Sequence, residues 1–431
     1  MNQKRNIIVK MKTLKMIHSF INYIMNVFFL VLLNIIFVYG FINPRRFNIK
    51  PKLLCIPEIE SIEDNNVNNP NYYKFGYFPR LEGPNINGVL TWYPIGFPND
   101  FRSNKLTKIT IRDKNYIIWK DSERFYGLKD ACSHQGSSFQ SGTIKKNCIT
   151  CPYHGYTFNS NGELKDIPEL KIVNNNNKIE AFKVIEKNGI VFLNTVPITD
   201  ENENQIDDKL IWIEPEANDS NQKAVLLAEN FEHNAKFVSV NSLDICHIGF
   251  VHTFGNRKNP NPVQNSQILK MNDSDYHYKI RYEYLSGANS IVSQIFNFNK
   301  IIVENEYILP HTTVARVIFG NYSSTIITMA LPISKFKTRL FVKSYRNYWY
   351  TNLDKINPFN YLVYKILNKL GDMITYDTMF KTLKQDKVIV DNIDKIDYKT
   401  MHGFFSIKYD MMSNHYKHYY KKYYEFDKYI L

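Results

Sequence analysis

Two cysteines and two histidines lie in two short segments that could together bind a pair of iron ions. Cys132 and His134 are two residues apart, and after a gap of sixteen residues Cys151 and His154 follow, three residues apart. Two thiolates can bind one iron of a [2Fe-2S] cluster and two neutral imidazoles the other, which raises the reduction potential above that of an all-cysteine cluster. The alternative is a zinc site with Cys148 and Cys151 as a C-x-x-C pair. The proline, glycine and aromatic residues beside the second pair favour the cluster, because zinc does not require them.

A second concentration of ligand-type side chains follows about a hundred residues later, where His247 and His252 come shortly after Asp244. Two imidazoles and one carboxylate on one side of Fe(II) leave positions open for O2 and substrate. Residues five apart in an ideal helix point about 140° from each other, so both histidines can bind one ion only if the helix bulges or ends between them. Gly249 permits such a break. A pair of structural histidines on a buried helix is the alternative for this segment by itself.

The first pair of segments resembles the cluster loops of Rieske iron–sulfur proteins. C-P-Y-H-G-Y at 151–156, with Asn161-Gly162 in the next turn, is similar to the second loop of that family. High-potential members brace the loops with a disulfide, and this chain has Ser137 and Tyr153 at those positions. The resemblance therefore implies a cluster of the low-potential ferredoxin or oxygenase kind. Its four ligands would be Cys132, His134, Cys151 and His154.

The second segment resembles the D-x-x-H-x-x-x-x-H element of Rieske non-haem iron oxygenases. The resemblance implies that His247 and His252 bind a mononuclear iron. It also implies that Asp244 is the electron and proton bridge between this iron and a cluster ligand on a neighbouring subunit. Many members carry a carboxylate four residues before this aspartate, where the present chain has Val240. That departure removes no expected ligand.

The same resemblance implies a third iron ligand, a carboxylate from a helix more than a hundred residues later. In the family it often stands in a Q-D context before an apolar, helical stretch, and Gln385-Asp386 fits that description. We therefore expect Asp386 to be the ligand, with Asp391 and Asp377 as reserves. A solvated surface acid is the alternative for each of them.

Short runs rich in β-branched and aromatic residues must position the cluster loops. Between residues 89 and 199 such runs are separated by turn residues, which predicts a small all-β domain. The expected strands are Leu106–Arg112, Tyr116–Trp119 and Gly189–Leu193.

An acidic, polar stretch at 200–208 marks the expected boundary of a second domain at 209–431. This part mixes strand-like alternation with helical patterns and predicts an α+β domain, which by resemblance is helix-grip-like. The expected strands lie across Tyr276–Tyr284 and Thr312–Leu331, and the expected helices around Ala228–Gly249 and Asn360–Asn392.

The pattern of the first 44 residues predicts a targeting signal. Basic residues precede a run from Met16 to Pro44 that contains no Asp, Glu, Lys or Arg, which is typical of a secretory signal. A membrane anchor of about 20 apolar residues is the alternative. The basic, acid-free continuation past a junction at Gly40 and Phe41 resembles the two-part presequence of algae with secondary plastids. It implies a plastid location, with 45–88 as a transit-like linker.

Charge and cysteine content exclude other classes. The net charge is +13, but residues 1–52 hold nine Lys and Arg and no Asp or Glu, so the remainder is nearly neutral and nucleic-acid binding has little support. Five cysteines are too sparse for a disulfide framework. The sequence contains no Gly-rich nucleotide loop of the G-x-G-x-x-G or G-x-x-x-x-G-K type. We therefore expect the reducing equivalents to come from an external donor.

The resemblance covers about residues 89–431 and implies an oxygenase that uses O2 and electrons from ferredoxin or a reductase to hydroxylate or oxygenate an organic substrate. Trp92-Tyr93-Pro94, the plastid targeting signal and the single-chain layout resemble the chlorophyllide a oxygenase and pheophorbide a oxygenase group, which implies a tetrapyrrole substrate. By resemblance the working unit is a homotrimer. The match to that group is incomplete, because the chain has no cysteine after Cys246 and no long apolar run after residue 44.

A Rieske electron carrier or a redox-regulated plastid membrane component, without oxygenase chemistry, is the competing hypothesis. The discriminating feature is the predicted mononuclear triad of His247, His252 and Asp386. A carrier does not need these three residues.

Overall fold

The computed structural model describes residues 91–421, apart from 123, 169, 171–176, 201, 203–205, 266, 272–275 and 396–407. The predicted targeting segment at 1–44, its cleavage site and the linker at 45–88 lie outside the described residues. None of the helices within the described ranges combines the length and the apolar character that crossing a bilayer requires.

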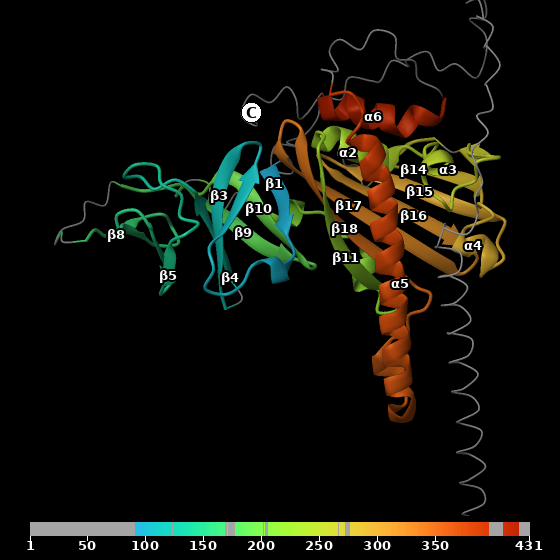
Figure 1. Ribbon diagram of the computed structural model, residues 1–431, viewed down its shortest axis with the longest axis horizontal. Helices are drawn as coiled ribbons and strands as arrows, with labels where there is room; N and C mark the ends of the chain where they lie inside the picture. The colour runs from blue at the N-terminus through green and yellow to red at the C-terminus, as the bar shows by residue number, and fades with distance from the viewer. Residues whose placement is uncertain are drawn as a thin grey trace, which may run out of the picture. The chain divides into compact units, whose positions relative to one another are not determined.

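An antiparallel six-stranded sheet is formed by the first part of the described chain, with the order β1-β10-β9-β4-β3-β2 (Figure 1). Its strands are β1 (Trp92–Gly96), β2 (Thr107–Ile111), β3 (Lys114–Asp121), β4 (Arg124–Lys129), β9 (Ala181–Lys187) and β10 (Ile190–Pro197). Side chains alternate between two cores, as a strand requires: Ile117 and Trp119 belong to one, Tyr116 and Ile118 to the other. The sheet is therefore buried on both faces.

A smaller four-stranded sheet packs on one of these faces. It consists of β5 (Thr143–Lys145), β6 (Cys148–Thr150), β7 (Thr157–Phe158) and β8 (Leu164–Asp166). Phe139, Ile149 and Phe158 are fully buried in the core that it shares with Ile117 and Trp119. Because β6 ends at 150 and β7 begins at 157, the loop 151–156 is a tight connection between two paired strands.

An eight-stranded antiparallel sheet forms the remainder, in the order β11-β18-β17-β16-β15-β14-β12, with β13 also paired to β14. The predicted strands are confirmed, since Tyr276–Tyr284 lies in β14 apart from its first residue, and Thr312–Leu331 forms the hairpin of β16 and β17. The strands are β11 (Lys223–Phe231), β12 (Gln264–Asn265), β13 (Leu269–Lys270), β14 (His277–Leu285), β15 (Lys300–Ile308), β16 (Thr312–Phe319), β17 (Tyr322–Ser334) and β18 (Lys337–Arg346).

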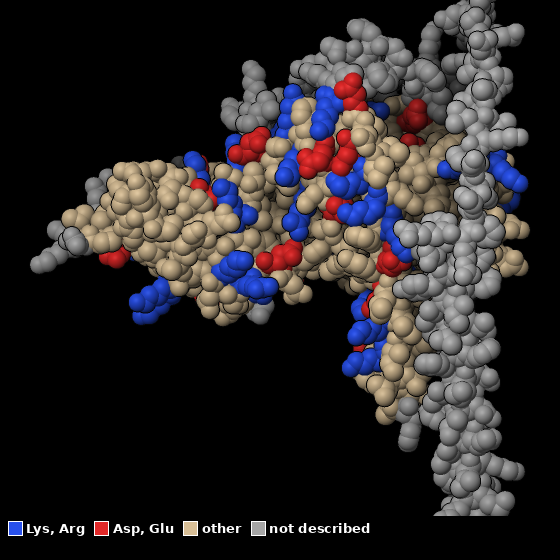
Figure 2. Space-filling view, viewed as in Figure 1, with Lys and Arg blue, Asp and Glu red and all other residues tan. Residues whose placement is uncertain are grey.

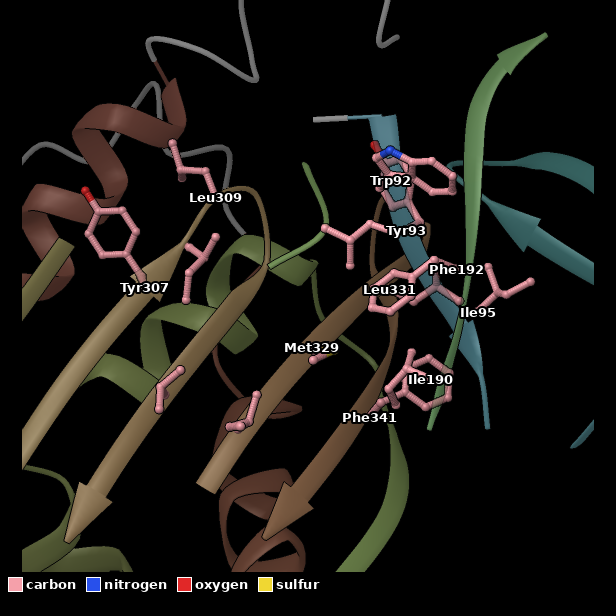
Figure 3. Close-up of a cluster of buried hydrophobic side chains, with 14 of the residues drawn as sticks. Trp92, Tyr93, Ile95, Ile190, Phe192, Tyr307, Leu309, Met329, Leu331 and Phe341 are labelled. Carbon is pink, nitrogen blue, oxygen red and sulfur yellow. The ribbon is translucent and has the colours of Figure 1, made fainter. Parts of the chain in front are cut away.

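One face of this large sheet packs against the six-stranded sheet. Met329 and Leu331 of β17 and Phe341 of β18 lie in one core with Tyr93 of β1 and Phe192 of β10 (Figure 3). The intervening residues of β17 and β18 point to the other face and pack beneath the helices. The layers therefore follow one another as small sheet, six-stranded sheet, eight-stranded sheet and helices. The predicted division into domains at 89–199 and 209–431 stays a prediction.

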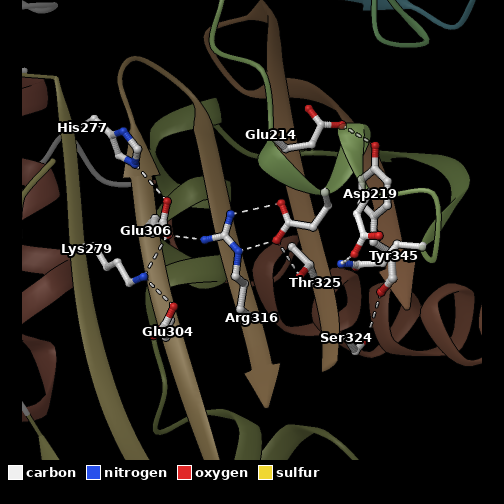
Figure 4. Close-up of polar contacts among 12 residues, drawn as sticks. Glu214, Asp219, His277, Lys279, Glu304, Glu306, Arg316, Ser324, Thr325 and Tyr345 are labelled. Atoms are coloured by element: carbon white, nitrogen blue, oxygen red, sulfur yellow. Dashed lines mark hydrogen bonds and ion pairs between the residues drawn. The ribbon is translucent and has the colours of Figure 1, made fainter. Parts of the chain in front are cut away.

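A network of buried charges lies on the inner face of the large sheet (Figure 4). His277 Nε2 lies 2.9 Å from a carboxylate oxygen of Glu306, and Arg316 forms ion pairs with both Glu306 and Glu216. Burial raises the pKa of Glu306, but His277 and Arg316 outweigh burial and hold it below its usual range. Thr325 donates a hydrogen bond of 2.9 Å to Glu216. These contacts satisfy charges that burial alone would make costly.

Five helices complete the described part: α2 (Ala235–Leu243), α3 (Ile248–Val251), α4 (Ile291–Gln294), α5 (Pro358–Val390) and α6 (Met411–Tyr420). The helix predicted around Asn360–Asn392 is confirmed as α5. The helix predicted around Ala228–Gly249 was wrong for its first residues, because 228–231 belongs to β11 and pairs residue by residue with β18. Tertiary pairing overrides the helix propensity of Ala and Glu there. The helix begins only after Asn234, whose side chain caps it by accepting 2.8 Å from the amide of Phe237.

The long helix α5 is held on β11 by an apolar core and by flanking ion pairs. Leu383 and Val390 are buried against Leu227 and Phe231 of β11. Lys223 and Glu229 of β11 lie 2.6 Å from Asp372 and Lys384 of α5, respectively. Figure 2 shows Lys and Arg interspersed with Asp and Glu over the face viewed, α5 included. This docking fixes the rotation of α5 about its axis.

Candidate metal centres

The two cluster loops have the same backbone fold. In each loop the amide of Cys132 or Cys151 donates to the carbonyl five residues later, at 2.9 and 2.8 Å. The amide of the glycine four residues on, Gly136 or Gly155, returns to the carbonyl of that cysteine at 2.7 and 3.1 Å. These glycines have φ of +74° and +75°, in the left-handed region that side chains disfavour. The repeated turn explains why each motif needs a glycine at this place.

The four predicted cluster ligands come together at the tips of these loops. Cys132 and Cys151 are 3% and 2% exposed, whereas His134 and His154 lie at the surface. The Nδ1 atoms of the two imidazoles are 3.1 Å apart, and the ring of Tyr156 stacks on His134. Burial raises the pKa of the Cys132 thiol, and the neighbouring Cys151 adds to this effect, although backbone amides lower it. Two buried thiols and two exposed imidazoles form a donor set that fits a [2Fe-2S] cluster.

A buried carboxylate that the sequence did not reveal supports the first loop. Asp130 accepts 2.7 Å hydrogen bonds from the hydroxyl of Ser138 and from the backbone amide of Phe139. Lys108 lies 3.5 Å from the same carboxylate. These contacts tie the chain that leaves the loop to the end of β4. A lone aspartate before a Cys-x-His pair carries no signal of this role.

The histidines of the second site lie at the two ends of α3. His247 is its N-cap residue, and His252 is its C-cap residue with an extended backbone. Residues 248–251 between the histidines are helical, and the helix ends at His252 rather than at Gly249. Gly249 lies inside α3, where a Cβ atom would stand 2.7 Å from the Cβ of Pro260. The glycine serves close packing and not the bend.

Asp386 joins the two histidines from α5. Its Oδ1 atom lies 3.3 Å from Nε2 of His247 and 3.4 Å from Nε2 of His252. One ligand atom from each of the three residues lies within 4.8 Å of the others. The reserve candidates lie elsewhere: Asp377 forms an exposed ion pair with a lysine one turn away, and Asp391 accepts a backbone amide. Nine residues place Asp377 about 180° around the helix from Asp386.

Two further side chains hold this triad, and sequence reasoning missed both roles. Nδ1 of His252 lies 3.1 Å from Oε1 of Gln385, and an amide oxygen can only accept. A proton on Nδ1 of His252 would be donated to this oxygen, which leaves the Nε2 lone pair available to a metal ion. Asn241 of α2 donates 3.2 Å to Asp386 Oδ1. Such partners orient metal ligands and fix their tautomers.

Burial and the shared Asp386 carboxylate act in opposite directions on the pKa values of the two histidines. Burial lowers the pKa of His247, but the Asp386 carboxylate outweighs burial and raises the pKa above its ordinary value. The pKa of His252 is lowered by burial and by His247, although Asp386 opposes this. Nδ1 of His247 is buried without a hydrogen-bond partner among the described residues, and the nearest carboxylate oxygen, from Asp244, is 3.9 Å away. Two imidazoles and one carboxylate fit a mononuclear Fe(II) ion.

Comparison with known proteins identifies the first of these sites. Residues 91–180 match the Rieske [2Fe-2S] domain family. The chain carries a Rieske domain. The resemblance that the sequence predicts is thereby confirmed, and this Rieske domain indicates a [2Fe-2S] cluster.

Curated proteins similar to this chain are named as oxygenases. The chain is 26% identical over 103 residues to chlorophyllide a oxygenase of Arabidopsis thaliana, which is 24% of this chain and 19% of the relative. It is 26% identical over 283 residues to pheophorbide a oxygenase of Oryza sativa subsp. japonica, 60% of this chain and 49% of the relative. A 3-ketosteroid-9-alpha-monooxygenase oxygenase component of Rhodococcus rhodochrous is 26% identical over 162 residues, 37% and 41% of the two chains. The matches thus span less than half of each relative.

Solved structures confirm the predicted fold class. Dicamba monooxygenase bound to dicamba superimposes with a TM-score of 0.62 at 16% identity, covering 78% of this chain and 97% of that one. NdmA of Pseudomonas putida CBB5 with caffeine gives 0.58 at 15% identity, covering 77% and 90%. The chain therefore shares the fold of these proteins over the part that is matched.

The partner of His252 generates a prediction about metal affinity. Replacing Gln385→Leu removes the acceptor that fixes the His252 tautomer, so we expect iron at the second site to bind about 10- to 100-fold more weakly. The cluster should remain unchanged. The measurement is competition for iron against a chelator of known affinity. Gln294→Leu, an exposed glutamine on α4, is the control and should match the wild type. Equal affinities for the Gln385→Leu variant and the wild type would refute the assigned role.

Proposed function

We propose that this chain is a Rieske-type oxygenase, which uses O2 and electrons from an external donor to hydroxylate or oxygenate an organic substrate. The observation that carries the proposal is the convergence of His247, His252 and Asp386 in a chain that also has a Rieske domain. An electron carrier has no need of this triad. The oxygenase names of the relatives support the same conclusion.

The bound metal groups would supply one-electron transfer at the Rieske domain and O2 activation at the triad. The protein's own residues do the positioning. His134 and His154 present imidazoles at the surface, where a reduced ferredoxin or reductase can dock. Gln385 and Asn241 fix the ligand rings and carboxylate. Asp244, half-exposed and 3.9 Å from Nδ1 of His247, would be the electron and proton bridge to a cluster ligand of a neighbouring subunit.

We propose a homotrimer in which the cluster of one subunit serves the triad of the next. The layered fold supports this arrangement. Within one chain the small sheet packs on the outer face of the six-stranded sheet, and α2 and α5 pack on the far face of the eight-stranded sheet. The six-stranded and eight-stranded sheets therefore lie between the cluster loops and the triad of the same subunit. In the proposed trimer the electron would pass instead from exposed His154 of one subunit to half-exposed Asp244 of a neighbour.

The substrate that we propose is a chlorophyll-type tetrapyrrole such as chlorophyllide a or pheophorbide a. The names of two relatives, both chloroplastic, support it. The same names support a plastid location. Residues 1–44 would be the targeting signal. Membrane association would depend on whether this segment is cleaved off or kept as an anchor.

The oxygenase proposal predicts substrate-dependent O2 uptake when the reduced protein is screened with chlorophyllide a, pheophorbide a and simple aromatic acids. Asp386→Ala should abolish uptake while the cluster stays reducible, because it removes only a triad carboxylate. Asp244→Ala should keep both metals and reduce turnover at least about tenfold. Asp377→Ala, on the same helix but in an exposed ion pair, is the matched control and should retain activity. A reducible cluster with no O2 uptake from any substrate would favour the electron carrier.

The trimer proposal predicts complementation between two inactive variants. Cys132→Ser removes a cluster ligand and Asp386→Ala removes a triad ligand. When the two proteins are unfolded and refolded together, mixed trimers should regain O2 uptake, since each intact cluster then faces an intact triad on another subunit. Refolding each variant alone is the control and should give no activity. Mixed trimers without activity, or an active monomer by light scattering, would contradict pairing between subunits.

A further inference from the structure

A pocket of about 470 Å³ opens beside the second metal centre. His252, a member of the triad, lines it, together with the residues that follow in the chain and a short turn after β14. Its polar lining consists of Thr253, Asn256, Arg257, Lys258 and Asn289. A volume of this order accommodates a small organic molecule or one edge of a larger one.

Close backbone packing builds the walls of this pocket. A Cβ on Gly255 would stand 2.0 Å from the carbonyl oxygen of Ile248, and one on Gly287 would stand 2.2 Å from that of Phe254. The side-chain amide of Asn256 donates to the carbonyls of residues 285 and 286 at 3.3 Å each. These contacts join the two lining segments to each other and to α3. The pocket is therefore a formed part of the fold.

The charge of the pocket is positive. Arg257 and Lys258 are the charged residues among its lining, which contains no Asp or Glu. One guanidinium nitrogen of Arg257 donates 3.0 Å to the carbonyl of Phe250, at the end of α3, which orients the planar group. Within the described ranges, no carboxylate forms an ion pair with Arg257 or Lys258. A guanidinium fork with donors to spare matches the two oxygens of a carboxylate.

We propose that this pocket binds an organic substrate bearing a carboxylate, whose acid group contacts Arg257 and Lys258 while the rest of the molecule extends toward His252. The proposal rests on the proposed oxygenase function, because it assigns the substrate class of that same site. It makes Arg257 and Lys258 specificity-determining residues. A neutral molecule of the same shape leaves both cations without a partner in the pocket and should bind less well.

The test compares an acid with its own methyl ester, which has the same ring system and no charge. The probes are pheophorbide a with its methyl ester, and 2-naphthoate with its methyl ester. Dissociation constants are measured by fluorescence on the iron-loaded protein without reductant, so that no turnover occurs. We expect the wild type to bind each acid about tenfold more tightly than the ester, and we expect salt to reduce this preference.

The variant Arg257→Gln/Lys258→Gln should lose the preference for the acid while its affinity for the ester stays unchanged. Arg281→Gln/Lys300→Gln, on β14 and β15, removes the same charge outside the pocket and should keep the preference. Equal binding of acid and ester by the wild type overturns the proposal. A preference that persists in Arg257→Gln/Lys258→Gln overturns it as well. The salt dependence of the wild type provides a readout that needs no variant.

The outcomes separate this proposal from the oxygenase proposal. A preference for the acid that depends on Arg257 and Lys258, in a protein that shows no O2 uptake, supports the pocket and overturns the oxygenase. Conversely, O2 uptake with neutral substrates that is equal in the wild type and in Arg257→Gln/Lys258→Gln overturns the pocket proposal and leaves the oxygenase intact.

Discussion

The second candidate metal centre depends on the contact of one buried carboxylate, Asp386, with the imidazoles of His247 and His252. Asp386 lies on the same face of α5 as Leu383 and Val390, and these two residues pack against β11. The apolar packing of α5 thus places the Asp386 carboxylate beside the two histidines. A buried carboxylate requires a positive charge nearby. The Asp386 carboxylate raises the pKa of His247 against the effect of burial, and an Fe(II) ion held by the triad would provide such a positive charge.

The six-stranded sheet imposes the second constraint. Because its strands alternate between two cores, it must be covered on both faces, by the small sheet on one side and by the eight-stranded sheet on the other. The cluster loops then lie in the outermost layer, with Cys132 and Cys151 turned inward and their histidine partners turned outward. Exposure of His134 and His154 is thus a consequence of the layering. The proposed electron exchange with another protein or subunit would use these exposed imidazoles.

Most of the candidate ligands stand in short motifs of fixed spacing, whereas Asp386 was expected from the family resemblance, and the structure brings the residues of each predicted site together. The residues that support these ligands could not be predicted. Gln385, Asn241 and Asp130 act through contacts with residues distant in sequence or through a local turn, and no periodicity marks such contacts. Similarly, Ala228 and Glu229 favour a helix, but pairing with β18 makes 228–231 a strand. Local patterns predict ligands and long elements, whereas tertiary contacts decide boundaries and supporting residues.

Anomalous diffraction at the iron absorption edge, from crystals of the full-length protein grown with ferrous iron, tests the central claim most directly. The account predicts two iron positions of unequal strength in each subunit. The stronger, a pair of irons, should lie among Cys132, His134, Cys151 and His154. The weaker, a single iron, should lie between His247, His252 and Asp386. Iron at the first position alone, with the triad joined only by hydrogen bonds, would contradict it.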